Sequence, residues 1–460
     1  MEEYNYDALA STIKIEDITS DEHNQVIIRQ LKENDPNRDL VCICDIDDAW
    51  SENDYCPVEE EMGWLGYYIG QNTSLWRLWI DRIDIICNIS FCRGLSCNTS
   101  ITHISFRDIN LSDESIFHLL NQFLKNNSNL SYFDAESCVL GADATISALS
   151  SCKSLEHIVL STNQIVNGQM TDIIEALSMH PQLHTVELSM GMSIGRNELA
   201  ALATLLHSMT ELQTLKLYDN GIDDEGIEAF AYALANSDCN LEKLIIYCNR
   251  IGDKGALILA NALKRNCKLK ELDLKNNGIT ADGWRAFSKL LCDASSVNKT
   301  YLSNHTLGNL GAVPDLSPRL QAYLRMNEGI EDRGQIAMVK ILQNHSHFNV
   351  QPFFEWEFKV LPLLIGWMEN ATACIIALTL APDDSTNRVR TGYHQKIGRM
   401  KLSCIYDFVN EFPMLYIEPV TRQEIEDCSD MELQLKGDAT QMLKLEEVQR
   451  RKTRAMRRLL

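Results

Sequence analysis

One frame of sequence is repeated three times in succession, at Leu212–Ile222 (LQTLKLYDNGI), Leu241–Ile251 (LEKLIIYCNRI) and Leu269–Ile279 (LKELDLKNNGI). Positions 1, 4 and 6 of this frame are apolar, as in Leu269, Leu272 and Leu274. Side chains alternate along an extended segment, so positions 4 and 6 face one side and their neighbours face the other. The frame therefore predicts a strand with a buried side and an outward side.

A turn and a helix are predicted to follow each strand. Position 9 is an asparagine in four frames: Asn163, Asn220, Asn249 and Asn277. A buried amide at a turn can bond to backbone groups of its own coil and of the next one. Apolar pairs four residues apart then predict the buried face of a helix: Phe230 with Leu234, Leu259 with Leu263, and Phe287 with Leu291.

The same frame recurs along half of the chain. It starts every 25 to 29 residues, at Leu75, Ile101, Leu130, Leu155, Leu183, Leu212, Leu241, Leu269 and Val297. Units of this length cannot bury their apolar face alone and must stack into a solenoid. Among the frames without this asparagine, two have Cys138, whose thiol is a weak donor, and Ile109 at position 9. Pro314 and Pro318 break the helix expected after the last frame, which predicts the end of the array.

This pattern resembles the ribonuclease-inhibitor type of leucine-rich repeat. The resemblance covers Leu75 to Leu310 and implies an α/β horseshoe solenoid, with parallel strands on the concave side and helices on the convex side. The entry segment GWLGYYIG (63–70) and the later FFEWEFKVLP (353–362) are also similar to uncharacterised leucine-rich repeat proteins of diatoms and related algae. That second resemblance implies no activity.

The flanks of the repeats predict caps. We expect an acidic, mobile or partly helical arm at 1–36, and at 37–74 an irregular cap that packs Trp64, Leu65 and Ile69 inward. Repeats occupy 75–318. A helical C-terminal cap follows at 319–416, beginning with one helical segment from Leu320 to Gln343, and 417–460 form a final helix with a basic end.

The composition of the chain favours certain cellular compartments and certain classes of partner. The net charge of −22 disfavours nucleic acid as the main partner. Fifteen cysteines without a disulfide framework, and an acidic start without a secretory signal, predict reduced thiols in the cytoplasm or possibly the nucleus. The apolar stretch 360–381 is interrupted by Pro362 and Glu369, which favours a buried helix pair over a membrane span.

Three candidate chemistries are outweighed by simpler interpretations. Asp45-Ile-Asp47 resembles the first motif of haloacid-dehalogenase-type phosphatases, but the repeats begin too soon for that domain. Cys428-Ser-Asp430 resembles an element of bacterial ubiquitin ligases, yet its acidic setting raises a thiol pKa. A zinc site is not expected because no pair of cysteines has standard ligand spacing with a matching second pair, neither Cys42 with Cys44 nor Cys87, Cys92 and Cys97.

The outward strand positions 3, 5 and 7 are the candidate site. They are rich in aromatic rings and mixed charge, which is typical of recognition surfaces. The residues expected to contact a partner are Trp79, Tyr132, Glu187, Lys216, Tyr218, Ile245, Tyr247, Asp273, Lys275 and Tyr301.

The sequence therefore predicts a non-enzymatic scaffold that binds a protein or peptide on its concave face, with no cofactor, metal ion or catalytic residue. The alternative is a GTPase-activating protein, because the Ran GTPase activators use this class of repeat. Those proteins have an acidic C-terminal tail, whereas this chain ends in a basic one.

Overall fold

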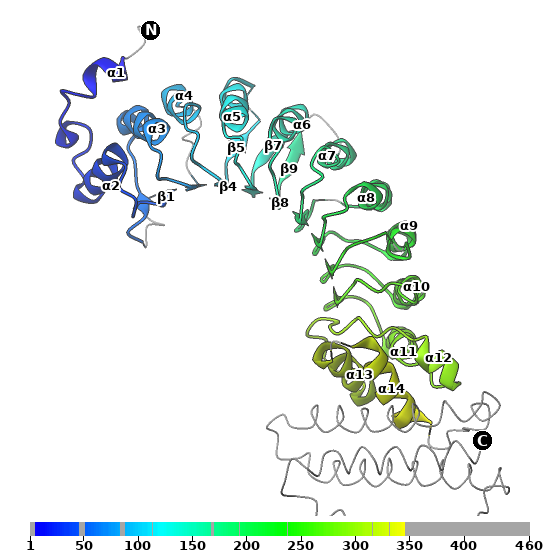
Figure 1. Cartoon of the computed structure of the whole chain (residues 1–460). Coiled ribbons are helices and arrows are strands. Elements are labelled where there is room, and N and C mark those ends of the chain that lie inside the picture. The colour runs from blue at the N-terminus through cyan, green and yellow to red at the C-terminus, as the bar shows by residue number, and fades with distance from the viewer. Residues whose placement is uncertain are drawn as a thin grey trace, which may run out of the picture. The chain divides into compact units, whose positions relative to one another are not determined.

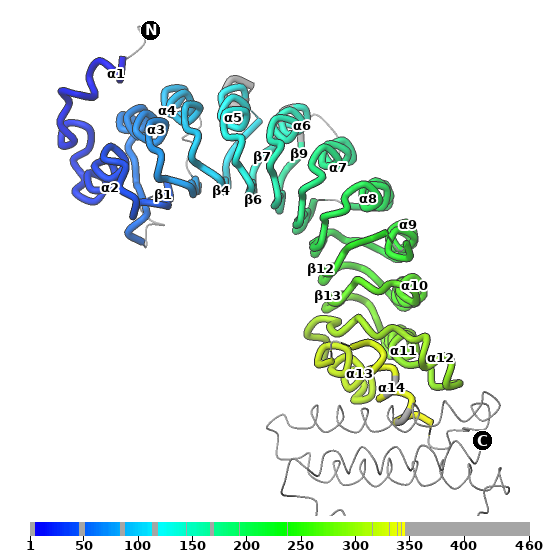
Figure 2. Tube along the Cα trace, in the orientation of Figure 1, coloured from blue at the N-terminus to red at the C-terminus, as the bar shows by residue number. Residues whose placement is uncertain are grey.

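The computed structural model describes residues 5–45, 51–82, 88–112, 114–166, 170–192, 194–236, 238–314, 316–330 and 332–345, and these residues all fall in one compact unit. Within them, the repeat units form an α/β solenoid. Figure 1 shows the strands along one side of the repeats and the helices along the other, and Figure 2 shows each coil of the trace lying beside the next. The solenoid expected from the leucine frame is confirmed.

The strands of successive coils pair in parallel into a ten-stranded sheet of order β13-β12-β11-β10-β8-β6-β4-β3-β1-β2. Its members are β1 (Leu40–Ile43), β2 (Asp54–Tyr55), β3 (Arg77–Asp81), β4 (His103–Arg107), β6 (Tyr132–Glu136), β8 (His157–Ser161), β10 (Thr185–Glu187), β11 (Thr214–Lys216), β12 (Lys243–Ile245) and β13 (Glu271–Asp273). The register aligns equivalent frame positions, for example Leu215 with Leu244 and Leu244 with Leu272. A smaller parallel sheet joins β5 (Asn110–Leu111), β7 (Val139–Gly141) and β9 (Gln164–Val166).

Helices cover the other side of the coils and supply the second half of the core. They are α3 (Met62–Gln71), α4 (Ile89–Leu95), α5 (Glu114–Asn126), α6 (Ala142–Ser151), α7 (Met170–Leu177), α8 (Arg196–Ser208), α9 (Asp224–Leu234), α10 (Asp253–Ala262) and α11 (Ala281–Leu291). The pairs predicted four residues apart are buried, among them Phe230 with Leu234 and Phe287 with Leu291. Frame position 1 is buried throughout, from Leu75 to Leu269.

The predicted asparagines satisfy the turns that follow the strands. Asn249 Oδ1 accepts from the backbone N–H groups of Asn220 and Ile222, both at 3.0 Å, and its Nδ2 donates to the carbonyl of Leu217 in the previous coil. Cys138 replaces the amide with a thiol that contacts the carbonyl of Phe106, as its donor chemistry predicted. Each turn also holds frame position 8 in the left-handed region, from Arg82 to Asn276, with φ between 51° and 64°.

A second set of asparagines, which sequence reasoning missed, stands three residues before frame position 1. Asn98 Nδ2 donates to the carbonyls of Ile69 and Asn72, while its Oδ1 accepts from the backbone N–H of Ile101. Asn266 makes the equivalent bonds to Leu234 and Leu269. These amides join the C-terminal end of one helix to the start of the next strand.

The last predicted frame, from Val297, is wrong. Val297–Tyr301 is a short helix, α12, and the ninth coil begins at Leu307, where Glu271 and Asn309 form a parallel bridge. Asn304 identifies the true start because its Oδ1 accepts from the backbone N–H of Leu307. The segment between Leu291 and Leu307 is therefore an insertion.

The N-terminal end is more ordered than the expected arm. After α1 (Tyr6–Leu9) and a 3₁₀ turn, η1 (Ile15–Asp17), helix α2 (Glu22–Glu33) buries Ile27, Ile28 and Leu31. Strand β1, with a further 3₁₀ turn at η3 (Glu59–Glu61), leads into α3, in which Trp64, Leu65 and Ile69 are buried as predicted. The cap therefore includes α2.

At the other end of the repeats, two helices stand where one was predicted. They are α13 (Pro318–Gly329) and α14 (Arg333–Asn344), with Pro318 in the first turn and Ser317 as the N-cap of α13. Proline suits that position because the first turn needs no backbone donor. The helices expected after residue 345, including the one at 417–460, lie outside the described residues.

Candidate interaction surface

We call the strand side of the ten-stranded sheet the inner face, since the strands lie on the inside of the curve of the repeats (Figure 1). Burial alternates along its strands, as in β3, where Leu78 and Ile80 are buried while Arg77, Trp79 and Asp81 are not. The predicted alternation of positions 3, 5 and 7 with positions 4 and 6 is therefore confirmed. The inner face is a ribbon of outward side chains set by the register of the sheet.

An aromatic row crosses five neighbouring coils of the inner face. It consists of Trp76, His103, Tyr132, His157 and His184, whose consecutive ring centroids lie 5.0, 5.4, 5.8 and 6.5 Å apart. Burial lowers the pKa of His103 and of His157, so their rings are neutral at physiological pH and can stack without repulsion. Of this row, sequence reasoning singled out only Tyr132 as a contact residue.

Glu187 is the centre of a polar cluster next to this row. Its carboxylate accepts from Tyr218 Oη at 2.7 Å, from Lys216 Nζ at 2.9 Å and from Ser161 Oγ at 3.3 Å. The Glu187 side chain is buried, and burial together with this carboxylate raises the pKa of Tyr218. The structure thus brings together three residues that the sequence named separately.

Tyr218 and Tyr247 form a stacked tyrosine pair. Their ring centroids lie 4.5 Å apart with an interplanar angle of 9°. The bond from Tyr218 to Glu187 fixes the first ring, and the second lies against it. Offset stacks of this kind hold two large surfaces rigid, which lowers the entropy lost when a partner binds.

A shallow hollow of about 450 Å³ lies beside the aromatic row, and Tyr132 and His157 of that row line it. Among the residues that line it are Tyr132, His157, Glu187, Lys216 and Ile245. Nearby, Asp134 Oδ1 is buried without a hydrogen-bond partner among the described residues, and burial, followed by the charges of Glu136 and Glu187, raises the pKa of this carboxyl to about 6. A donor from outside the chain would relieve this oxygen.

The other predicted contact residues lie apart from this centre. Trp79 is 47% exposed near the N-terminal edge of the sheet. Asp273 and Lys275 lie at the opposite end, where the backbone N–H of Lys275 donates to Asp273 Oδ1. Tyr301 is not on the inner face as predicted, because it ends helix α12 in the insertion. Whether any of these residues contacts a partner stays a prediction.

Within the described residues, neither the phosphatase motif nor a zinc site that includes Cys92 gains support. The strand before Asp45 pairs with β3 as part of the repeat sheet. Cys92 is buried in α4. Asp47, Cys87, Cys428 and Asp430 lie outside the residues described. No helix in the described part of the chain is long and apolar enough to cross a membrane.

Comparisons with known proteins agree with this fold. A family model for the leucine-rich repeat matches residues 208–231, 237–260 and 265–288. The chain is 27% identical over 254 residues to mouse NACHT, LRR and PYD domains-containing protein 14, a match that covers 53% of this chain and 25% of that protein. It is 27% identical over 196 residues to mouse ribonuclease inhibitor, covering 36% of this chain and 42% of the inhibitor.

Among solved structures, an internalin from Listeria monocytogenes matches 58% of this chain and 93% of its own, with 14% identity and a TM-score of 0.29. A TM-score at this level carries no argument. The chain is an α/β solenoid of leucine-rich repeats, and its matches span between a quarter and about two fifths of the length of these two curated relatives.

Proposed function

We propose that this leucine-rich repeat protein is a non-enzymatic scaffold that binds a protein or peptide across its inner face. The observation that carries the proposal is the aromatic row together with the stacked tyrosine pair. Rings aligned over neighbouring coils give contact area that solubility alone does not require. Tyrosine and tryptophan anchors of this kind dominate binding energy in protein interfaces.

The charges of the inner face support recognition of a protein more than of a polyanion. Several are paired with each other across strands, for example Arg107 Nη2 with Glu136 Oε2 at 2.6 Å and Lys243 Nζ with Glu271 Oε2 at 3.2 Å. Exposed pairs add little affinity, but they set the register of a partner. Nucleic acid needs a basic surface, and this chain carries a net charge of −22.

The hollow beside the aromatic row suggests how a partner is held. An apolar side chain of the partner would enter it, and a donor of the partner, such as a backbone N–H, would reach Asp134 Oδ1. The predicted cytoplasmic or nuclear setting is part of the proposal, and it is supported by the described cysteines, none of which forms a disulfide. Within the described residues no observation favours GTPase activation.

A double substitution of the tyrosine pair tests the proposal. The full chain is used as bait in native lysate, the captured proteins are identified, and the Kd of the main partner is then measured. Tyr218→Ala with Tyr247→Ala should weaken that Kd at least about tenfold, because two rigid anchors are lost.

Tyr232→Ala is the matched control. Tyr232 is 82% exposed on helix α9, on the opposite side of the coil from the inner face. Its removal should leave the Kd unchanged, and circular dichroism should show the same helix content in all three proteins. An unaltered Kd in the double variant, or an equal loss in Tyr232→Ala, would reject binding at the inner face.

A further inference from the structure

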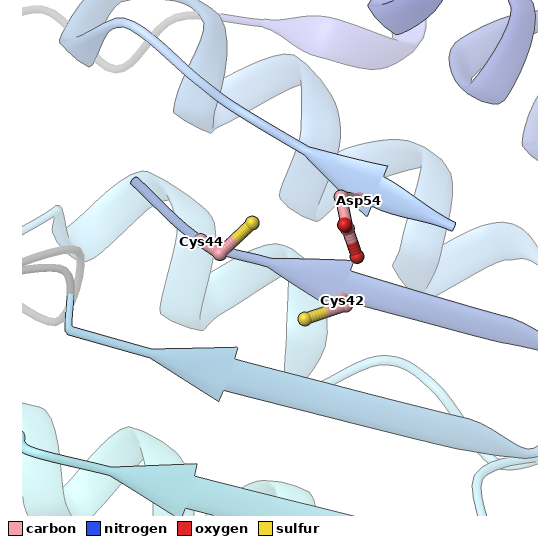
Figure 3. A group of neighbouring side chains, drawn as sticks. All are labelled: Cys42, Cys44 and Asp54. Carbon is pink, nitrogen blue, oxygen red and sulfur yellow. The ribbon is translucent and has the colours of Figure 1, made fainter. Parts of the chain in front are cut away.

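A group of thiols and a carboxylate lies at the N-terminal edge of the inner face. Cys42 Sγ, Cys44 Sγ and a carboxylate oxygen of Asp54 all lie within 4.8 Å of one another. Figure 3 shows Cys42 on β1, Cys44 just after the end of that strand and Asp54 on the neighbouring strand β2. A fourth ligand group is adjacent, because the backbone N–H of Cys44 donates to the carbonyl of Tyr55, which places Cys56 next to Cys44 across the two strands.

The register of two parallel strands creates this group. Cys42 is opposite Asp54, and one residue further Ile43 is opposite Tyr55, so Cys44 and Cys56 extend the same alignment. The buried Val41 and Ile43 turn the other way, into the core. The spacing of Cys42 and Cys44 lacked a matching second pair in the sequence, and Asp54-Tyr-Cys56 on the neighbouring strand supplies it.

We propose that Cys42, Cys44, Asp54 and Cys56 bind one zinc ion. Three sulfur ligands and one carboxylate oxygen complete the four-coordinate shell that structural zinc sites use. Sulfur ligands of a tetrahedral zinc ion lie about 3.8 Å apart, given zinc–sulfur bonds of about 2.3 Å. The sulfur atoms of Cys42 and Cys44 and the carboxylate oxygen of Asp54, already within 4.8 Å of one another, reach such a spacing by small side-chain rotations.

The surroundings of the group suit a divalent cation. Asp81 acts on Cys42, and Asp21 and Asp45 act on Cys56, so the field at the thiols is negative. Each thiol that coordinates the ion releases its proton to solvent, and the resulting thiolates together with the Asp54 carboxylate balance the charge of the dication.

Backbone hydrogen bonds hold the proposed ligands in place, and a metal ion can reach them. The backbone N–H of Cys42 donates to the carbonyl of Asn53, that of Cys44 donates to the carbonyl of Tyr55, and the backbone N–H of Ser51 orients Asp54 Oδ2 at 2.6 Å. Cys44 is 2% exposed, whereas Cys42 and Cys56 are only half-buried and leave a path for the ion. The metal would tie the two-residue strand β2 to the sheet, so its role is structural.

Metal titration of the full chain tests the assignment. The protein is fully reduced, stripped with a chelator and titrated with Co²⁺ without oxygen, and Zn²⁺ is then added. One equivalent of cobalt should produce thiolate-to-metal charge-transfer absorption with tetrahedral ligand-field bands, and zinc should displace it. Zinc should also raise the Tm of the stripped protein, because it binds the folded chain alone.

Cysteine variants locate the site. Cys42→Ser combined with Cys44→Ser should abolish the charge-transfer band, and Cys56→Ser alone should weaken zinc at least about tenfold in competition with a chromophoric chelator. Cys97→Ser and Cys267→Ser remove exposed thiols elsewhere and should keep one equivalent of metal. Because Cys44 is buried, circular dichroism of each stripped variant checks folding, and Cys56→Ser gives a test that spares the buried position.

Two results would overturn the proposal. One is a fully reduced wild-type chain that takes up less than one equivalent of metal. The other is a charge-transfer band that persists in the Cys42 and Cys44 double variant. A Cys44–Cys56 disulfide that re-forms in preference to metal binding after reduction would count with the first result, because neighbouring strands also permit that cross-link.

Discussion

Asn249 shows why an amide, rather than another polar group, recurs at the turns. Its side chain accepts from two backbone N–H groups and donates to the carbonyls of Leu217 and Ile246, so it joins two coils through both of its polar atoms. A carboxylate could only accept, and a hydroxyl has a single proton to donate. The side chain is buried, so water cannot take over these bonds.

Replacing Asn249 with alanine should therefore destabilise the repeats by roughly 3 kcal/mol, since several buried backbone groups lose their partners. Urea unfolding followed by circular dichroism measures the change. Asn298→Ala is the control: Asn298 is exposed on α12, and its loss should change stability by less than about 0.5 kcal/mol. Equal midpoints for the two variants would contradict the role assigned to the turn amides.

At the scale of single residues, the period of two along a strand predicts which side chains point outward, and it placed Trp79, Tyr132, Tyr218 and Tyr247 correctly on the inner face. The period does not predict which long side chains meet. The choice of Glu187 as partner for both Lys216 and Tyr218 depends on side-chain geometry across two coils. His184 was overlooked because it stands one position before the strand positions considered.

At the scale of elements, the repeats were predictable as long as their length was regular. The error at Val297 arose because the insertion carries apolar residues at the frame spacing, although Thr300 in its middle bonds to Asp293 and Ser296 as part of a helix. The reliable signal was an asparagine three residues before position 1, as at Asn266 and Asn304. The sequence did not predict strand β2, because two residues are too few to show an alternating pattern. The proposed metal-binding group was missed for the same reason.

Helix α14 packs on the last coil through a buried lysine. Lys340 is 0% exposed, and its Nζ donates to the carbonyl of Leu291 at 2.7 Å and to Asn327 Oδ1 at 2.8 Å. Burial lowers the pKa of Lys340 to about 7. Burial also lowers the pKa of His305 to about 4, so its neutral ring can accept from Lys340 at Nδ1.

The lowered pKa of Lys340 predicts that the stability of the folded chain rises with pH. Between pH of about 7 and 10.5, the folded chain holds fewer protons at Lys340 than the unfolded chain, so the free energy of unfolding increases with pH across this window. The increase amounts to about 1 kcal/mol per pH unit. Below pH 7 both states are protonated, and the contribution stops changing.

Urea unfolding at pH 7, 8 and 9 measures this slope as a difference between the wild type and Lys340→Met. The difference removes the contributions of all other titrating groups. Lys289→Met, which removes an exposed lysine on α11, should keep the slope of the wild type. A wild-type slope in Lys340→Met would show that the buried ammonium is not the source.

At the scale of the whole described unit, each coil contacts its neighbours in sequence order, so stability is a chain of nearest-neighbour interfaces. The N-terminal end of this chain is closed by α2, which packs against α3 and buries Ile27 and Ile28 at 0% exposure. Disruption of α2 at this end should unfold the adjacent coils first and leave distant coils intact.

Ile28→Asp tests this expectation by placing an unpaired carboxylate beneath α2, which should cost at least about 3 kcal/mol at that end. Hydrogen exchange should then be faster in β1 and α3 and unchanged in β11, β12 and β13. Val26→Asp on the same helix is the control, since Val26 is 44% exposed. Faster exchange over all coils alike would instead indicate one cooperative unit.

At its C-terminal edge, the sheet ends in a way that limits the addition of further strands. The coil at Leu307 adds a single bridge to β13, Gly311 then turns away at φ 83°, and Asn327 of α13 donates to the Leu307 carbonyl. A strand edge normally offers a row of free amides on which a second molecule can polymerise. Here the amides of Leu272 and Leu274 on β13 already donate to Asn309 and Leu310, and the Leu307 carbonyl accepts from Asn327, so these groups offer a second molecule no template for fibre formation.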